Sequence, residues 1–343
     1  MRAPDFWEKD GRLLPALLAP LAAGYAAAGR LRQAAIQPWK APVPIICVGA
    51  LTVGGAGKTP VALALGRHLG SQGRQVHFLT RGYGGRDAGP LRVDPARHHA
   101  GDVGDEALLL AQTAPCWVAR NRPAGARAAA TAGAEVIVMD DGFQNPSLAK
   151  DLALLVIDGG HGLGNGRVLP AGPLREPVGR ALARADAVVL IGEDRAGLHP
   201  ILSDRPVLGA RLLPGPEAQA LAGRKLLAFA GLGRPEKFFA SLRAIGADVA
   251  ATVVFPDHHP YSADEVEQLC DQADRLHARP VTTAKDAVRL PPALRDRVQV
   301  ATVHIEWADS AALDRLLASK IHPAGEAGEH PDVCRQLFHS PPV

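Results

Sequence analysis

The sequence contains little cysteine, and its cysteines are not grouped. Cys47, Cys116, Cys270 and Cys334 are the only four in 343 residues, and no two of them form a C-x-x-C pair. Zinc sites and disulfide frameworks need close, regular cysteine spacing, so the sequence argues against both. We expect structural free thiols in a reducing compartment.

An excess of charge of one sign is also missing. The 38 lysines and arginines are nearly balanced by 35 aspartates and glutamates, and the formal charge is +3. No dense basic run occurs, so a nucleic-acid partner is not expected. The glycine fingerprint of dinucleotide-binding proteins is absent as well, because Gly82-Tyr83-Gly84-Gly85 lacks a third glycine at the required spacing.

The first residues lack the basic start of a signal peptide, because acidic side chains offset the basic ones there. An uncharged segment, residues 13–29, follows and is interrupted by Pro15 and Pro20. Its leucines recur at helical spacing, at Leu13, Leu14, Leu17, Leu18 and Leu21. The segment predicts either a helix in the membrane interface or an ordinary core-packing helix, and taken alone it favours neither.

A strand followed by a glycine-rich loop is the most informative feature that is present. The apolar run 43–51 leads into eight residues, Thr52, Val53, Gly54, Gly55, Ala56, Gly57, Lys58 and Thr59, and a helical pattern follows. This order is typical of a P-loop, in which backbone N–H groups and the helix N-terminus bind phosphate. Lys58 would contact the β- and γ-phosphates of ATP, and Thr59 would bind Mg²⁺. Thr52 departs from the usual pattern, which has glycine there.

A second apolar strand, residues 136–140, ends in Asp140 and Asp141. Two adjacent carboxylates at the end of a buried strand are unfavourable unless a cation compensates their charge. Either aspartate therefore qualifies as the second metal-side ligand of a P-loop enzyme. An ordinary Asp-Asp-Gly turn is the alternative.

The remaining pattern predicts an α/β protein with a doubly wound, mostly parallel sheet of the P-loop NTPase type. With 47% hydrophobic residues, the chain is able to bury a large core. Predicted strands of the core are 45–51, 76–80, 117–119, 136–140, 154–158 and 187–191. We expect four parts: an N-terminal helical segment 1–40, a P-loop core 41–205, a smaller α/β domain 206–322 and a loosely held tail 323–343.

Three polar segments have several interpretations on their own. Asp105 starts a helical pattern and fits an N-cap. The segment from Asp257 to His259 lies between prolines and fits a metal cluster, an acid/base pair or a solvated loop. The segment around Lys285 and Asp286 joins a strand to a helix and fits simple capping.

Taken together and in order, the motifs resemble the tetraacyldisaccharide 4′-kinase family, the lipid A 4′-kinases. The resemblance spans residues 3–305 and rests on Phe6-Trp7, the loop Val53 to Pro60, Arg81-Gly82-Tyr83-Gly84, Gly104-Asp105-Glu106, Asp140-Asp141-Gly142-Phe143-Gln144, Pro170 to Glu176, Asp257-His258 and Lys285-Asp286. Thr52 is compatible with the loop of that family. Asn145 departs from it, because many members have histidine at this position.

The resemblance implies transfer of phosphate from ATP, with Mg²⁺, to the 4′-hydroxyl of a tetraacyldisaccharide 1-phosphate. The product would be lipid IVA, made at the cytoplasmic face of the inner membrane. By the family motifs Asp105 is the expected base and His258 its partner, while Arg122, Arg175 and Glu176 are expected to contact the acceptor or the nucleotide. A lipid acceptor also favours the membrane-interface interpretation of the N-terminal segment.

Other classes of protein remain as alternatives. A P-loop switch ATPase often has lysine directly before the glycines, where this chain has Val53. Another small-molecule kinase at the membrane surface would share the P-loop and the apolar segment. A nucleotide-binding membrane adaptor without catalysis would have no need for Asp105 and His258.

Overall fold

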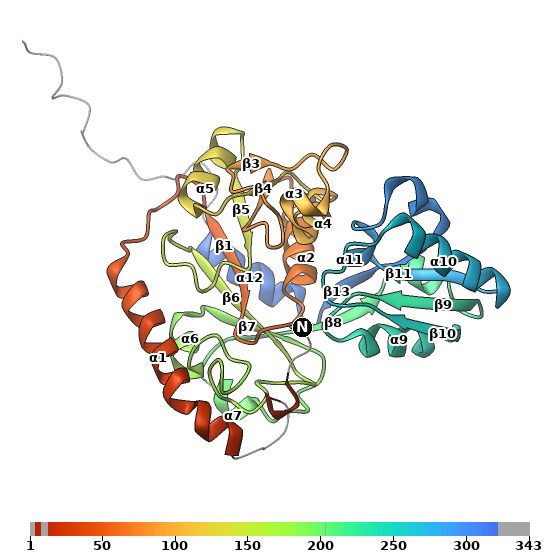
Figure 1. Ribbon diagram of the computed structural model, residues 1–343. Coiled ribbons are helices and arrows are strands. Elements are labelled where there is room, and N and C mark those ends of the chain that lie inside the picture. The colour runs from red at the N-terminus through yellow and green to blue at the C-terminus, as the bar shows by residue number, and fades with distance from the viewer. Residues whose placement is uncertain (1–3, 8–12, 203, 322–343) are drawn as a thin grey trace, which may run out of the picture.

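The computed structural model describes residues 4–7, 13–202 and 204–321, and these residues form two sheets in two domains (Figure 1). The larger sheet has nine strands in the order β13-β8-β7-β6-β1-β5-β2-β4-β3. All neighbours in it are parallel except at the two edges, where β13 runs against β8 and β3 runs against β4. The strands are β1 (Ile45–Ala50), β2 (Val76–Thr80), β3 (Leu91–Arg92), β4 (Cys116–Val118), β5 (Val136–Asp140), β6 (Leu152–Asp158), β7 (Ala187–Ile191), β8 (Val207–Pro214) and β13 (Val303–Trp307).

Helices cover both faces of this sheet. On one face, α2 (Lys58–Ser71), α4 (Asp105–Ala111) and α12 (Ser310–Lys320) bury their apolar sides in one core. On the other face, α5 (Arg122–Thr131), α6 (Val178–Arg184) and α7 (His199–Leu202) contribute to a second core. The short α3 (Ala100–Val103) precedes α4. Because the central strands are covered on both sides they are continuously apolar, and the expected doubly wound fold is confirmed.

The smaller sheet is wholly parallel, with the order β10-β9-β11-β12. Its elements are β9 (Lys225–Ala230), β10 (Asp248–Val254), β11 (Arg279–Thr283), β12 (Gln299–Ala301), α8 (Pro216–Gln219), α9 (Pro235–Ala244), α10 (Ala263–Arg275), α11 (Ala284–Ala287) and the 3₁₀ helix η2 (Pro292–Arg297). Phe239 of α9 packs on one face and Leu269 of α10 on the other. The smaller sheet thus has a hydrophobic core on each of its faces.

Sheet membership differs from the expected domain boundary at residue 206. β8 pairs with β7 and β13 returns to pair with β8, so both belong to the larger sheet. The chain leaves the smaller sheet at Thr302, whose carbonyl accepts a hydrogen bond from the Gly215 N–H at 2.9 Å. We therefore propose that the smaller domain is an insertion, residues 215–302. The expected tail 323–343 lies outside the described residues.

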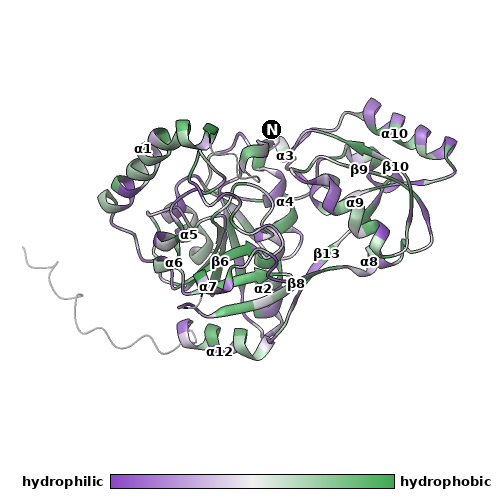
Figure 2. Cartoon of the chain, turned by 90° about the horizontal axis from the view of Figure 1, so that it is seen from below, coloured by the Kyte–Doolittle hydropathy of each residue, from purple (hydrophilic) through white to green (hydrophobic). Residues whose placement is uncertain are grey.

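A long N-terminal helix, α1 (Leu13–Ala35), runs along the outside of the larger domain, preceded by the 3₁₀ turn η1 (Asp5–Trp7). Figure 2 shows that most of its length is hydrophobic. Within the described part of the chain, it is the one helix with the length and mean hydropathy, 1.2 over 18 residues, of a membrane-crossing helix. Only Pro15 and Ala22 are buried, while Leu13 and Leu31 are 80% and 71% exposed. The expected apolar helix is confirmed, and its apolar side is left uncovered.

Two glycines of α2 provide a test of this packing. A Cβ at Gly66 would lie 2.3 Å from the ring of buried Phe78, whereas a Cβ at Gly70 meets nothing within 4 Å. Both changes to alanine raise helix propensity, by up to about 1 kcal/mol. Gly66→Ala should nevertheless destabilise the protein by about 1–3 kcal/mol through overpacking, while Gly70→Ala should be neutral or stabilising. Denaturant unfolding of the two variants checks this, and equal stabilities would contradict it.

Candidate active site

The glycine-rich loop joins β1 to α2 at the carboxyl ends of the parallel strands of the larger sheet. Gly54 and Gly57 have positive φ angles of 95° and 90°, and a Cβ at Gly57 would lie 2.5 Å from Ile191. No side chain of the described residues caps α2, so its first backbone N–H groups remain open. The loop is fixed from outside, because the Val53 N–H donates to the Pro173 carbonyl at 2.9 Å. This is the geometry of an anion site at a helix N-terminus.

Thr59, in the first turn of α2, contacts the end of β5. Its hydroxyl donates to Oδ2 of Asp140 at 2.9 Å. Asp140 is fully buried, and its other oxygen, Oδ1, has no hydrogen-bond partner among the described residues. Burial, with the nearby charge of Glu106, raises the pKa of Asp140 to about 7. A buried carboxylate oxygen without a partner is costly, so the position fits a bound cation.

Asp141 lies beside Asp140 but holds cations of the protein itself. It accepts hydrogen bonds from Nη1 of Arg175 at 2.9 and 3.1 Å, and Nζ of Lys58 is 3.7 Å from Oδ1. Its φ of 53° turns it away from the strand direction. Burial alone would raise the pKa of Asp141, but Lys58 and Arg175 outweigh burial and lower it. Of the two aspartates, Asp140 is therefore the one with a carboxylate oxygen free to bind an added cation.

The other expected site residues have mainly structural contacts. Glu176 is buried and receives two hydrogen bonds of 2.6 Å from Arg184, so it does not point freely into the site. Arg122 is buried at the start of α5 and donates to the Ala119 carbonyl at 2.5 Å. Burial lowers the pKa of Arg122 to about 10.

Asn145, the residue that departs from the family pattern, closes its own turn. Its side-chain oxygen accepts hydrogen bonds from the N–H and the hydroxyl of Ser147 at 2.9 and 2.8 Å. Its backbone carbonyl accepts a hydrogen bond from Lys150 Nζ at 2.6 Å. The contacts of Asn145 are thus within the loop after β5.

Asp105 and His258 meet across the two domains. Asp105 starts α4 in the larger domain and His258 lies after β10 in the smaller one, and Nδ1 of His258 is 2.9 Å from Oδ2 of Asp105. The Asp105 side chain is 2% exposed and its Oδ1 accepts from the Glu106 N–H at 2.9 Å, whereas the His258 side chain is 28% exposed. Burial would raise the pKa of Asp105, but the hydrogen bond from His258 and the charges of Lys285 and Arg289 lower it.

Three residues beside this pair were not singled out from the sequence as site residues. Nζ of Lys285 lies 3.4 Å from Nε2 of His258 and 3.6 Å from a carboxylate oxygen of Glu106. The ring of Tyr83 lies 5.4 Å from the His258 ring, centroid to centroid. Lys285, Glu106 and Tyr83 all stand in the motifs that carry the family resemblance, which was the one signal in the sequence that could have selected them.

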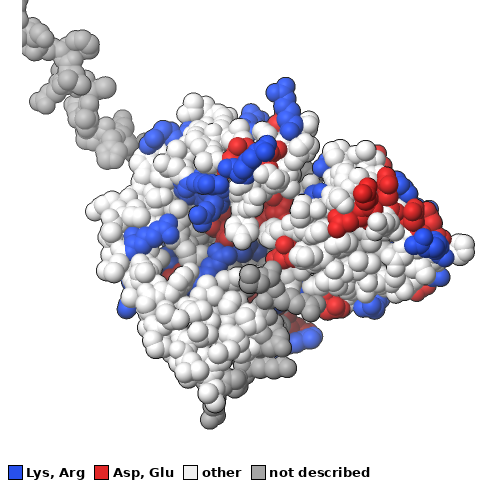
Figure 3. All heavy atoms as spheres, viewed as in Figure 1, with Lys and Arg blue, Asp and Glu red and all other residues white. Residues whose placement is uncertain are grey.

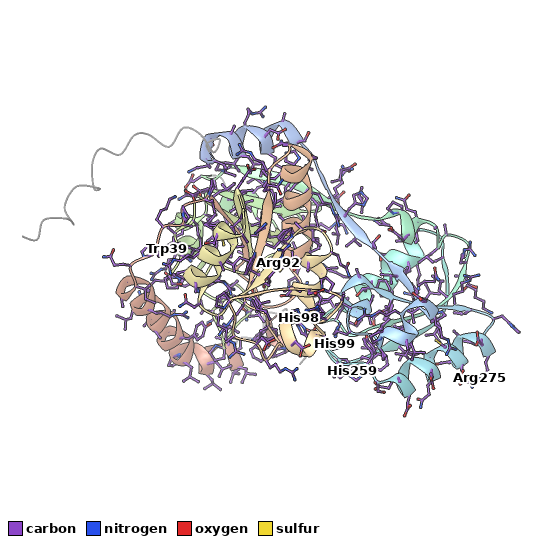
Figure 4. The ribbon with its side chains drawn as sticks, turned by 90° about the horizontal axis from the view of Figure 1, so that it is seen from above. Trp39, Arg92, His98, His99, His259 and Arg275 are labelled. Atoms are coloured by element: carbon purple, nitrogen blue, oxygen red, sulfur yellow. The ribbon has the colours of Figure 1, made fainter. Side chains whose placement is uncertain are left out.

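The surroundings of the site are strongly charged. Figure 3 shows basic side chains gathered on the face of the larger domain, with acidic side chains between them and the smaller domain. Figure 4 places His98 and His99, which precede α3, at the edge of the larger domain that faces His259 of the smaller domain. Groups from both domains therefore line the junction in which His258 and Asp105 meet.

Comparisons with known proteins show the family of this chain. Residues 14–322 match the family model described as tetraacyldisaccharide-1-P 4′-kinase. A tetraacyldisaccharide 4′-kinase of Rhodospirillum centenum is 58% identical over 335 residues, covering 96% of this chain and 99% of that protein. That of Rhodospirillum rubrum is 54% identical over 330 residues, covering 94% and 99%.

A solved structure of "apo" form LpxK from Aquifex aeolicus, in complex with ATP, superposes with a TM-score of 0.74. It shares 26% sequence identity, and the match covers 90% of this chain and all of that one. The resemblance inferred from the motifs and the fold class inferred from the pattern are both confirmed. From its sequence and its fold, the chain belongs to the tetraacyldisaccharide-1-P 4′-kinase family.

Proposed function

We propose that this protein phosphorylates the 4′-hydroxyl of a tetraacyldisaccharide 1-phosphate with ATP, giving lipid IVA. The observation that carries the proposal is the histidine–carboxylate pair, His258 and Asp105, in the same site as a phosphate-binding loop. The two halves are close enough that Glu106, next to Asp105, raises the pKa of Asp140 at the end of β5. A switch ATPase would have no need for the pair.

The phosphates of ATP are assigned to the loop from Thr52 to Thr59. Its backbone N–H groups and the N-terminus of α2 would bind phosphate oxygens, and Lys58 would neutralise charge that develops on the transferred group. Arg175 stands beside the same carboxylate as Lys58, 2.9 Å from Asp141, and a guanidinium suits phosphate oxygens. Glu176 and Arg122, buried as they are, would support this wall of the site.

Thr59 and Asp140 are the residues that would hold Mg²⁺. The described residues contain no group of three histidine, cysteine, aspartate or glutamate side chains suited to a metal. Mg²⁺ in kinases needs only one or two protein oxygens, because waters and phosphates complete its shell. The free Oδ1 of Asp140 fits that requirement. Bound Mg²⁺ would offset charge on the phosphates.

The acceptor hydroxyl needs a base. We assign proton removal to Nε2 of His258 and orientation of the ring to Asp105, which reverses the roles expected from the family motifs. Asp105 is buried with both oxygens engaged, whereas His258 is partly exposed. The Lys285 ammonium, which can only donate, lies 3.4 Å from Nε2, and this supports a lone pair on that atom.

The helix α1 would bring the enzyme to its lipid. Exposed leucines on α1 form an apolar surface, and Arg30 and Arg32 at its end suit anionic headgroups. Gln33 accepts a hydrogen bond from Arg180 at 2.9 Å, which ties α1 to the larger domain. This contact favours a helix lying in the interface over one that crosses the bilayer. Because ATP is cytoplasmic, we assign the enzyme to the cytoplasmic face of the inner membrane.

The function is tested by incubating the purified protein with γ-labelled ATP, Mg²⁺, detergent and tetraacyldisaccharide 1-phosphate. Label in the lipid is expected, and Lys58→Ala should remove most of it. ATP consumption without labelled lipid would contradict the proposal and favour a switch ATPase.

Replacing His258 tests its role as base. His258→Gln should lower kcat by about 10²–10⁴-fold, with the KM for ATP unchanged, because general base catalysis contributes that much. The neighbouring His259→Gln is the matched control, since its ring contacts Glu265 and not Asp105. It should retain kcat within about threefold. A folded His258→Gln protein with the kcat of the wild type would refute the assignment.

Asp140 makes the unfolding free energy depend on pH. Its pKa is about 7 in the folded protein against 3.8 in the reference state, so the unfolded chain loses this proton first as pH rises. Without nucleotide, the free energy of unfolding therefore falls as pH rises from about 4 to 7, and the cost from this group stays constant above that. The free energy of unfolding of Asp140→Asn, compared with that of wild type, should therefore increase by on the order of 1–3 kcal/mol from pH 5 to pH 8. Denaturant titrations at both pH values check this; a difference that does not change with pH would contradict it.

Membrane binding is tested on the exposed face of α1. Leu17→Asp should weaken binding to anionic vesicles by about tenfold or more, because burying one leucine contributes about 1.5–3 kcal/mol. Val254→Asp, which changes an exposed apolar residue on the smaller domain, is the matched control. Vesicle sedimentation of both variants measures the effect. Equal binding would show that α1 does not contact the membrane.

A further inference from the structure

A buried carboxylate, Asp286, organises the smaller domain next to His258. It is 0% exposed and accepts four hydrogen bonds, from the Gly231 N–H at 2.8 Å, the Tyr261 hydroxyl at 2.7 Å, the Thr283 hydroxyl at 2.5 Å and Arg289 at 2.6 Å. Its charge is therefore fully compensated inside the protein, as a buried carboxylate requires. The Arg289 guanidinium is fixed by this contact.

Arg289 connects that carboxylate to the larger domain. Its side chain is 3% exposed and donates to three carbonyls, those of Gly231 at 3.1 Å, His259 at 3.1 Å and Lys285 at 3.3 Å. Its Nε also lies 3.6 Å from Oδ2 of Asp105, the oxygen to which His258 is bonded. One guanidinium thus contacts both the His258 segment and the carboxylate that faces it.

The His258 backbone needs such support. Its φ of 59° is in the left-handed region, which costs a residue other than glycine on the order of 1–3 kcal/mol unless its surroundings impose it. The His258 N–H donates to the Gly231 carbonyl at 3.3 Å, and the next carbonyl, that of His259, accepts from Arg289. Arg289 therefore donates to the carbonyl of Gly231, which accepts the His258 N–H, and to the carbonyl of the next residue, His259.

We propose that Arg289, held by Asp286, is a positioning residue that keeps His258 and Asp105 in register across the two domains. It donates to the Gly231 carbonyl that accepts the His258 N–H and to the His259 carbonyl, and its positive charge lies 3.6 Å from Oδ2 of Asp105. A lysine would not replace it, because only the planar fork of arginine reaches several acceptors at once. Arg289 is buried and acts through the pair, without touching the reacting groups. The inference rests on the proposed function of that pair.

The geometry also separates this role from simple stabilisation of the smaller domain. Arg295 lies in the same segment and likewise donates to backbone carbonyls, those of Leu290 at 3.1 Å and Val288 at 3.2 Å. Among the described residues, Arg295 forms no hydrogen bond or ion pair with His258 or Asp105. Arg289 and Arg295 are therefore matched arginines, of which one reaches Asp105.

The experiment is a double-mutant cycle in the labelled-lipid assay. Arg289→Gln should lower kcat by about 10–100-fold with the KM for ATP within about twofold, while Arg295→Gln keeps kcat within threefold. In a His258→Gln background, Arg289→Gln should cost less than threefold, because residues that act as a unit are not additive. Equal losses in both backgrounds, or an active folded Arg289→Gln protein, would overturn the proposal.

A second measurement does not depend on catalysis. In protein labelled with ¹⁵N-histidine, the Nδ1 proton of His258, assigned by its loss in His258→Gln, should be protected by Asp105 in wild type and Arg295→Gln. It should be lost or exchange rapidly in Arg289→Gln or, if that variant does not fold, in Arg289→Lys. An unchanged signal in the folded Arg289 variant would overturn the positioning role. A wild-type protein without kinase activity but with this pattern would refute only the proposed function.

Discussion

The hydrogen bond between His258 and Asp105 joins the larger domain to the smaller one. Asp105 is fixed by its place at the start of α4, and His258 by the Asp286–Arg289 pair behind it. Val288, one residue before Arg289, is buried in the core of the larger sheet, so apolar packing reinforces the polar link. The site exists only while these two domains stay in contact.

Charge balance is the second constraint on this site. Asp141 neutralises Lys58 and Arg175, two cations that stand beside the loop, and so keeps them ordered where phosphate would otherwise be their partner. Asp140 has no ion pair with either cation among the described residues, and burial raises its pKa to about 7 even though the charge of Lys58 opposes that shift. The two adjacent aspartates have the same chemistry, yet burial and neighbours give them opposite pKa shifts. Asp141 binds the cations of the protein, Lys58 and Arg175, whereas Asp140 has a carboxylate oxygen that suits an added cation.

Much of this could be predicted from the sequence. Strands buried on both faces are continuously apolar, so 76–80, 136–140 and 187–191 were found residue for residue. The P-loop pattern identifies the loop glycines, and it assigns Thr59 and one of Asp140 and Asp141 to the same metal without deciding between the two aspartates. The domain boundary does not follow from the sequence, because the sequences of β8 and β13 would fit either sheet and only their strand pairing assigns them to the larger one. Arg289 was also missed, since its role depends on its distance from Asp105, which is 184 positions away in the chain (289 − 105). For Glu176 and Arg122, which are expected to contact ligands, the structure shows partners within the protein, Arg184 and the Ala119 carbonyl.

The insertion of the smaller domain between β8 and β13 bears on the order in which the chain folds. During synthesis β8 emerges early, but its antiparallel partner β13 and the covering helix α12 emerge only after the whole smaller domain. Until then β8 is an open edge of the sheet, with unpaired N–H and C=O groups. The smaller domain, with its own cores, is able to fold first and bring Gly215 and Thr302 together. Once Gly215 and Thr302 are held together, the loop between β8 and β13 is already closed, which lowers the entropy cost of pairing them. The folded smaller domain would thus help the larger sheet to add its last strand.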